Sequence, residues 1–171
     1  MPGVTPRPLI AALAIALAAI ASGCATFTDS NNVARVEDRT LSLDELSALV
    51  SIEFNVPQGD EGSNVPGNAE AARQAMTNWI VGQVAAIELA ELDRGVSTDE
   101  IEQIEAQLAE ALPDISETGR AAYAETSAAI SAFGQLPQPI EFFIAAASDT
   151  DIYVDPRFGT FNPVDGVTPL R

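Results

Sequence analysis

The stretch "VARVEDRTLSLDELSALV", residues 33–50, decides the fold of this chain. Val33, Arg35 and Val36 predict a short strand, because alternating and β-branched residues favour extended structure. A turn over residues 37–39 and a returning strand at residues 40–41 should follow. This part of the sequence therefore predicts a small β element at the start of the folded domain.

The same stretch then predicts the start of a helix. Ser42 is followed three residues later by Glu45, which is the pattern of a capping box. In that motif each side chain accepts a hydrogen bond from the other residue's backbone N–H. We therefore expect a helix over residues 43–51, with Leu46 and Leu49 on its apolar face.

Working outward toward the C-terminus, the sequence predicts four more helices. Apolar residues recur at helical spacing over residues 69–92, 98–112, 115–133 and 140–148. The inward-facing stripe of the 98–112 helix is expected to consist of Ile101, Ile104, Leu108 and Leu112.

The ends of these helices also carry sequence signals. Gly95 is expected as the C′ residue that ends the 69–92 helix, because glycine adopts a left-handed conformation without strain. Ser97 and Glu100 predict a second capping box. Pro113 should stop the helix that this box begins.

The segment "DIYVDPRFGTF", residues 151–161, predicts a terminal strand followed by a turn at residues 156–159. Arg157 is expected to hold this turn by pairing with a carboxylate or a carbonyl. Short strands at the two ends of a domain are too small to be stable alone, so they should pair with each other. The predicted fold is mainly α: a single helical domain of about five helices over residues 33–171, with a small β element that pairs the N- and C-terminal strands.

The segment before this domain has the pattern of a secretory signal. Arg7 precedes an unbroken apolar run of 13 residues, Leu9 to Ala21. A membrane-spanning helix needs about 20 residues, whereas the apolar region of a signal peptide needs about 7–15. Residues 1–23 are therefore expected to be a signal peptide, which implies an extracytoplasmic location.

Cys24, the only cysteine in the chain, follows the small residues Ala21, Ser22 and Gly23. Small residues directly before a cysteine resemble the lipobox of bacterial lipoproteins, although Ala21 stands where that family usually has Leu. The resemblance implies cleavage before Cys24, a diacylglyceryl or palmitate-type lipid anchor on its thiol, and a tether over residues 24–32. The alternatives are an ordinary signal peptide with a chance cysteine and an uncleaved anchor.

Composition excludes several kinds of chemistry. The chain has no His and its eight basic residues are all Arg, so catalytic triads with His, His-ligated zinc and Lys-based nucleophiles are ruled out. After residue 23 the chain carries a net charge of −18, which disfavours nucleic acid as a partner. Asp149, Asp151 and Asp155 fall short of a calcium loop, because neither the Gly nor the bidentate Glu of such a loop follows. No metal and no cofactor is expected.

One Gly- and Pro-rich segment separates the first two helices. "NVPQGDEGSNVPGN", residues 55–68, has the composition of a loop. It is expected to be a plain connector, with a functional loop as the alternative.

The order of these elements resembles a known chaperone family. "VARVEDRTLSLDEL" followed by helices and by "ELDRGVSTDEIEQIEAQLAE" is similar to the N-terminal domain of SurA, whose helical arrangement PrsA and trigger factor share. The tail "VDPRFGTFNP" resembles the ending of SurA-like lipoproteins. This chain departs from them in having Glu37-Asp38 where the turn is usually Asn-Gly. It also lacks the histidines and the length of a prolyl isomerase domain.

The resemblance implies a non-enzymatic, membrane-anchored holdase that binds unfolded or secreted polypeptide segments. Such binding requires exposed apolar surface between helices. The candidate binding residues are Trp79, Phe142, Phe143, Phe158 and Phe161. Burial in the core is the stronger interpretation for each of them.

Two other functions stay open. One is a structural or adaptor lipoprotein that binds one specific folded envelope protein. The other is a small enzyme that uses two carboxylates, such as a glycosidase, which the low aromatic content and the lack of a strand-rich scaffold disfavour.

Overall fold

The computed structural model describes residues 31–54 and 69–170. The expected signal peptide, Cys24, nearly all of the tether and the Gly- and Pro-rich segment lie outside the described residues. Within those residues, no helix is both long enough and apolar enough to span a bilayer. Contacts group the chain from Asn31 onward into one compact unit.

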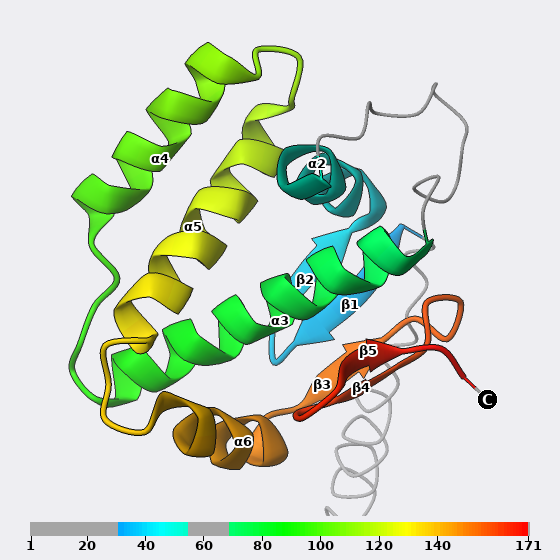
Figure 1. The fold of residues 1–171 in the computed structure, drawn as a ribbon, viewed down its shortest axis with the longest axis vertical. Coiled ribbons are helices and arrows are strands. Elements are labelled where there is room, and N and C mark those ends of the chain that lie inside the picture. Colours follow the sequence, from blue (N-terminus) through cyan, green and yellow to red (C-terminus); the bar gives the residue numbers. More distant parts are fainter. Residues whose placement is uncertain (1–30, 55–68, 171) are drawn as a thin grey trace, which may run out of the picture. The chain divides into compact units, whose positions relative to one another are not determined.

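The fold is mainly α with a small antiparallel sheet, as predicted (Figure 1). Strands β1 (Asn32–Val36) and β2 (Arg39–Ser42) form a hairpin, and helix α2 (Leu43–Phe54) follows directly. Helices α3 (Ala69–Glu91), α4 (Thr98–Ala111), α5 (Glu117–Phe133) and α6 (Pro139–Asp149) come next. The chain then forms β3 (Ile152–Val154), β4 (Thr160–Asn162) and β5 (Gly166–Thr168).

The predicted pairing of the two terminal strands is confirmed. The three-stranded sheet has the order β2-β1-β3, with Arg35 opposite Tyr153 and Val36 opposite Ile152. The amide of Asp155 extends the pairing by donating to the carbonyl of Val33 at 2.8 Å. β1 is therefore the central strand, and its two edges are covered by segments from opposite ends of the domain.

The first capping box is confirmed in full. The backbone amide of Ser42 donates to Glu45 Oε2 at 2.8 Å, and the amide of Glu45 donates to Ser42 Oγ at 3.2 Å. The second predicted box is confirmed in one half: Ser97 is the N-cap of α4, and its Oγ accepts a hydrogen bond from the amide of Glu100 at 3.4 Å. These contacts fix where α2 and α4 begin.

The end of α3 differs from the prediction. Asp93, with φ of 54°, is the left-handed C′ residue in place of Gly95. Its amide donates to the carbonyl of Ala90, and the amide of Arg94 donates to that of Leu89, which together form a Schellman motif. The helix ends before Gly95 because the amides of Asp93 and Arg94 already donate hydrogen bonds to the carbonyls of its last turn.

The core lies between the sheet and the helices α2 and α3. Leu41, Leu49, Met76 and Ile80 are fully buried there, and Phe158 and Val167 close it from the C-terminal segment. A second cluster joins Ala85 and Leu89 of α3 to Phe133 of α5 and to Leu136, which follows that helix.

The hairpin of β4 and β5 was not predicted. Its loop is held by Asn162 Oδ1, which accepts hydrogen bonds from the amides of Val164 and Asp165. The hairpin docks on α3 through the amide of Val167, which donates to Thr77 Oγ1 at 2.9 Å. Gly166, with φ of 73°, lets the backbone pass this close to Thr77.

Candidate functional site

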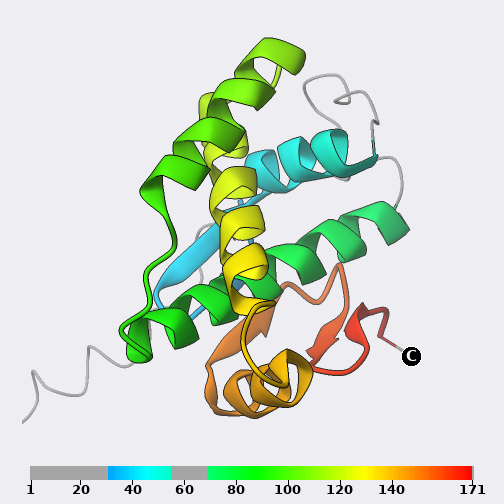
Figure 2. The ribbon, with the colours of Figure 1, turned by 60° about the vertical axis from the view of Figure 1, so that its left-hand side comes forward.

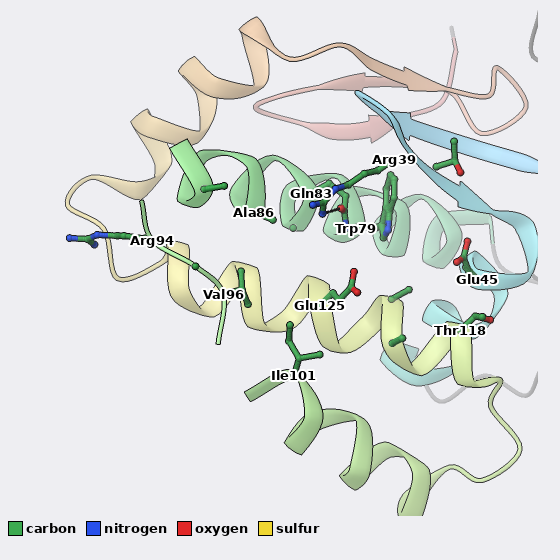
Figure 3. Close-up of a pocket in the computed structure, with 16 residues that line it drawn as sticks. Arg39, Glu45, Trp79, Gln83, Ala86, Arg94, Val96, Ile101, Thr118 and Glu125 are labelled. Carbon is green, nitrogen blue, oxygen red and sulfur yellow. Dashed lines mark hydrogen bonds between the residues drawn. The ribbon is translucent and has the colours of Figure 1, made fainter. Parts of the chain in front are cut away.

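An open cleft of about 710 Å³ lies between α3 and α5, with the segment before α4 and the first turn of α4 as a further wall (Figure 3). Trp79, Gly82 and Gln83 contribute from α3, and Ala121 and Ala122 contribute from α5. Gly82, Ala121 and Ala122 are small residues, and they leave open space between the two helices. Figures 1 and 2 show α4 standing beside α5, away from the sheet.

The floor of the cleft is fixed by close helix packing. A Cβ on Gly82 would lie 2.9 Å from Thr126 Cα, so only glycine lets α3 and α5 approach this closely. Trp79 is 4% exposed, so only a small part of its side chain borders the cleft. The floor of the cleft is therefore closely packed.

A polar contact closes one side of the cleft. The guanidinium of Arg39, from β2, donates from Nη1 to Gln83 Oε1 at 2.7 Å (Figure 3). Gln83 is buried on α3, whereas Arg39 is exposed. In Figure 3 this bond lies between Ala86 and Trp79, while Arg94 lies at one end of the cleft and Glu45 and Thr118 at the other.

The α4 wall is less buried than predicted. Ile101, Ile104, Leu108 and Leu112 were expected to face inward, and they are only half-buried. No residue of α4 is fully buried. The helix packs on α5, and its apolar stripe stays partly accessible beside the cleft, where Val96 and Ile101 line the wall.

Charges inside the cleft balance. Arg39 and Arg94 line it, and so do Glu45 and Glu125. Glu45 also holds the capping box at Ser42, which leaves Glu125 as the carboxylate that reaches from α5 toward α3 in Figure 3. In the described part of the chain, no group of His, Cys, Asp or Glu is arranged to hold a metal ion.

The five aromatic candidates do not share one surface. Trp79 and Phe158 are buried, and Phe143 and Phe161 are partly buried against the core. Phe142 is 44% exposed and lines a separate groove between α3 and α6. Of the five, only Trp79 borders the cleft.

Sequence reasoning missed most of the lining. Arg39, Gln83 and Ile101 come from three elements that only tertiary packing brings together. One signal was available: Ala121 and Ala122 are small residues at the inward side of α5, where larger side chains would have filled the cleft.

The role predicted for Arg157 is confirmed. Its side chain donates from Nε and Nη2 to Asp155 Oδ2 at 3.0 and 2.8 Å, and this pairing lowers the pKa of the Asp155 carboxyl below 3.8. Asp151 pairs with Arg35 at 2.9 Å. Two of the three aspartates of the imperfect calcium pattern are thus engaged with arginines.

Comparison with known proteins identifies no relative: no protein-family model, no curated protein and no solved structure matches the chain.

Proposed function

We propose that this protein is a lipid-anchored lipoprotein of the extracytoplasmic membrane face whose cleft holds segments of unfolded or secreted polypeptides. The observation that supports this most strongly is the open cleft between α3 and α5, bordered by an apolar helix stripe that stays half-buried. A binding site for extended segments needs accessible apolar surface on a rigid base. The protein acts without catalysis, and having no His it lacks the histidines of parvulin-type prolyl isomerases.

The cleft is tested by filling it without changing charge. Ala121→Trp places a large side chain in the cleft, and Ile101→Ser removes apolar lining from the α4 wall. Ser148→Trp on the exposed surface of α6 is the matched control. The full chain in a non-ionic detergent is added to reduced, denatured lysozyme, and light scattering follows aggregation.

The wild type and Ser148→Trp should slow aggregation, whereas both cleft variants should lose most of this effect. Circular dichroism and thermal unfolding show which variants are folded. If Ala121→Trp is not folded, the result for Ile101→Ser decides the test. Equal activity of all four proteins would contradict binding in the cleft, and no activity in any would contradict the holdase function.

The anchor is tested separately. Cys24→Ala removes the thiol that lipidation requires, and so the variant should appear in the soluble fraction after cell lysis while the wild type sediments with membranes. A diacylglyceryl group supplies two acyl chains, which is about what stable anchoring needs. Unchanged membrane retention of Cys24→Ala would contradict lipidation.

A specific adaptor is the second candidate function. Phe142 and Ile140 of α6 are 44% and 70% exposed, so this helix presents two large apolar side chains to a partner. Stoichiometric recovery of one folded envelope protein, lost in Phe142→Ser and retained in Ala121→Trp, would favour this function over the holdase.

A further inference from the structure

Helix α4 carries charge of a single sign. Its sequence contains five carboxylates and no arginine. They are Asp99, Glu100, Glu102, Glu105 and Glu110, all exposed or half-buried. Asp99 and Glu100 lie in the first turn, where the helix dipole favours them, but the other three have no such support.

These carboxylates are not neutralised within the described residues. Both ion pairs found there, Arg35 with Asp151 and Arg157 with Asp155, involve the β1–β3 region. Like charges at i, i+3 spacing, as for Glu102 and Glu105, repel one another on a helix. Repulsion between these carboxylates therefore lowers the local stability of α4.

The anionic helix is also a wall of the cleft. Ile101, flanked by Glu100 and Glu102, lines the cleft directly. Inside the cleft the two arginines and two glutamates balance, whereas α4, which borders the cleft through Ile101, carries only negative charge. Electrostatic complementarity then favours a guest polypeptide that is apolar in the part inside the cleft and positively charged in the parts that extend beyond the cleft along α4.

Resting on the function proposed above, we infer that the cleft selects polypeptide segments in which an apolar stretch is flanked by Lys or Arg. The apolar residues occupy the space beside Trp79, Ala121 and Ile101, and the flanking cations lie along α4. Acidic segments are repelled by α4. A second copy of this chain is disfavoured for the same reason, because the chain after residue 23 has a net charge of −18.

The inference is tested with two peptides of about a dozen residues that share one apolar centre and differ in having Lys or Glu at both ends. Fluorescence anisotropy measures their affinity for the full chain in a non-ionic detergent, at about 20 mM and about 500 mM salt. The Lys-flanked peptide should bind about ten-fold more tightly at low salt, and the difference should shrink to about two-fold at high salt because exposed charges are screened.

Two charge-matched variants locate the effect. Glu102→Gln, Glu105→Gln and Glu110→Gln together remove three charges from α4. Glu141→Gln, Asp149→Asn and Asp165→Asn remove three exposed charges from α6 and the β4–β5 loop, none of which lines the cleft. The α4 variant should lose most of the preference for Lys, whereas the control variant should keep it.

The outcomes separate the two proposals. Binding of neither peptide overturns both the polypeptide-binding function and the inferred selectivity. Equal binding of the two peptides, blocked by Ala121→Trp, supports the function and overturns the selectivity. A preference for Lys that falls equally in both charge variants also overturns the inference, since it would reflect net charge alone.

Discussion

Glu53 lies in an environment that disfavours its charge. It lies near the C-terminal end of α2, half-buried, and its Oε2 accepts a hydrogen bond from Asn78 Nδ2 at 3.0 Å. Burial raises the pKa of this carboxyl above 4.5, although the bond from Asn78 works in the opposite direction. The negative end of the α2 dipole also disfavours an anion there. The folded state therefore binds this proton more tightly than the unfolded state does.

Glu53→Gln is expected to raise the free energy of unfolding at about pH 7.5, by up to about 1 kcal/mol, because the amide keeps the bond from Asn78 and loses the charge. A carboxyl whose folded pKa is raised contributes stability that is lost as pH rises from the unfolded pKa through the folded pKa. The gain should therefore disappear as pH falls toward 4.5. Urea unfolding across this pH range is the measurement.

Glu110→Gln on the exposed face of α4 controls for net charge, since it removes the same charge from a solvated position. If it stabilises the protein as much as Glu53→Gln does, the effect comes from global repulsion or from the helix dipole, and burial of Glu53 does not account for it.

Gly82 is the residue on which the α3–α5 contact depends. A Cβ there would lie 2.8 Å from Thr126 Cγ2 and 2.9 Å from Thr126 Cα, and the backbone atom cannot give way without moving a helix. Gly82→Ala is expected to cost about 1–3 kcal/mol despite the better helix propensity of alanine. Gly95→Ala, where a Cβ would meet nothing within 4 Å, should change stability by less than about 0.5 kcal/mol. Equal thermal unfolding of the two variants would contradict this packing argument.

At the scale of elements, the end of α3 is a site of local strain. Asp93 adopts a left-handed conformation that costs a residue with a side chain about 1 kcal/mol, and it places a negative charge at the negative end of the helix dipole. The Schellman motif offsets part of this cost by satisfying two carbonyls.

Asp93→Gly should therefore stabilise the protein by about 1 kcal/mol, since it relieves both the strain and the charge. Asp93→Asn removes the charge alone and should yield a smaller gain. Thermal unfolding of the two variants separates the contributions. Destabilisation by Asp93→Gly would mean that the side chain makes a contact that outweighs the strain.

At the scale of the whole molecule, the two ends of the domain depend on each other. β1 is paired on one edge by its hairpin partner β2 and on the other by β3, more than a hundred residues later in the sequence. The backbone amide of Glu37 donates to the carbonyl of Asp151, and the backbone amide of Asp151 donates to Glu37 Oε1. The C-terminal segment also supplies Phe158 and Val167 to the core.

A chain that ends at Thr150 is accordingly expected not to fold, because it exposes an edge of β1 and opens the core. A chain that ends at Thr168 loses only residues beyond β5 and should unfold at nearly the wild-type temperature. Near-UV circular dichroism and amide exchange report on both. A cooperative thermal transition in the shorter chain would show that β3 is dispensable.

The sequence by itself determined most of the elements. Periodic apolar residues located the five described helices, and the capping box of Ser42 and Glu45 fixed the start of α2, because these signals act between residues a few positions apart. The instability of lone strands also predicted that β1 would pair with the strand at Ile152–Val154.

Only the tertiary structure decided the rest. The cleft arises because Gly82 brings α3 against α5 while Ala121 and Ala122 leave space beside them, and because α4 borders it only through Ile101 in its first turn. Asp93 replaces Gly95 at the helix end because hydrogen-bond geometry, and not residue type alone, sets the last turn. Distances between residues far apart in sequence depend on how whole helices pack, and local sequence patterns do not contain that information.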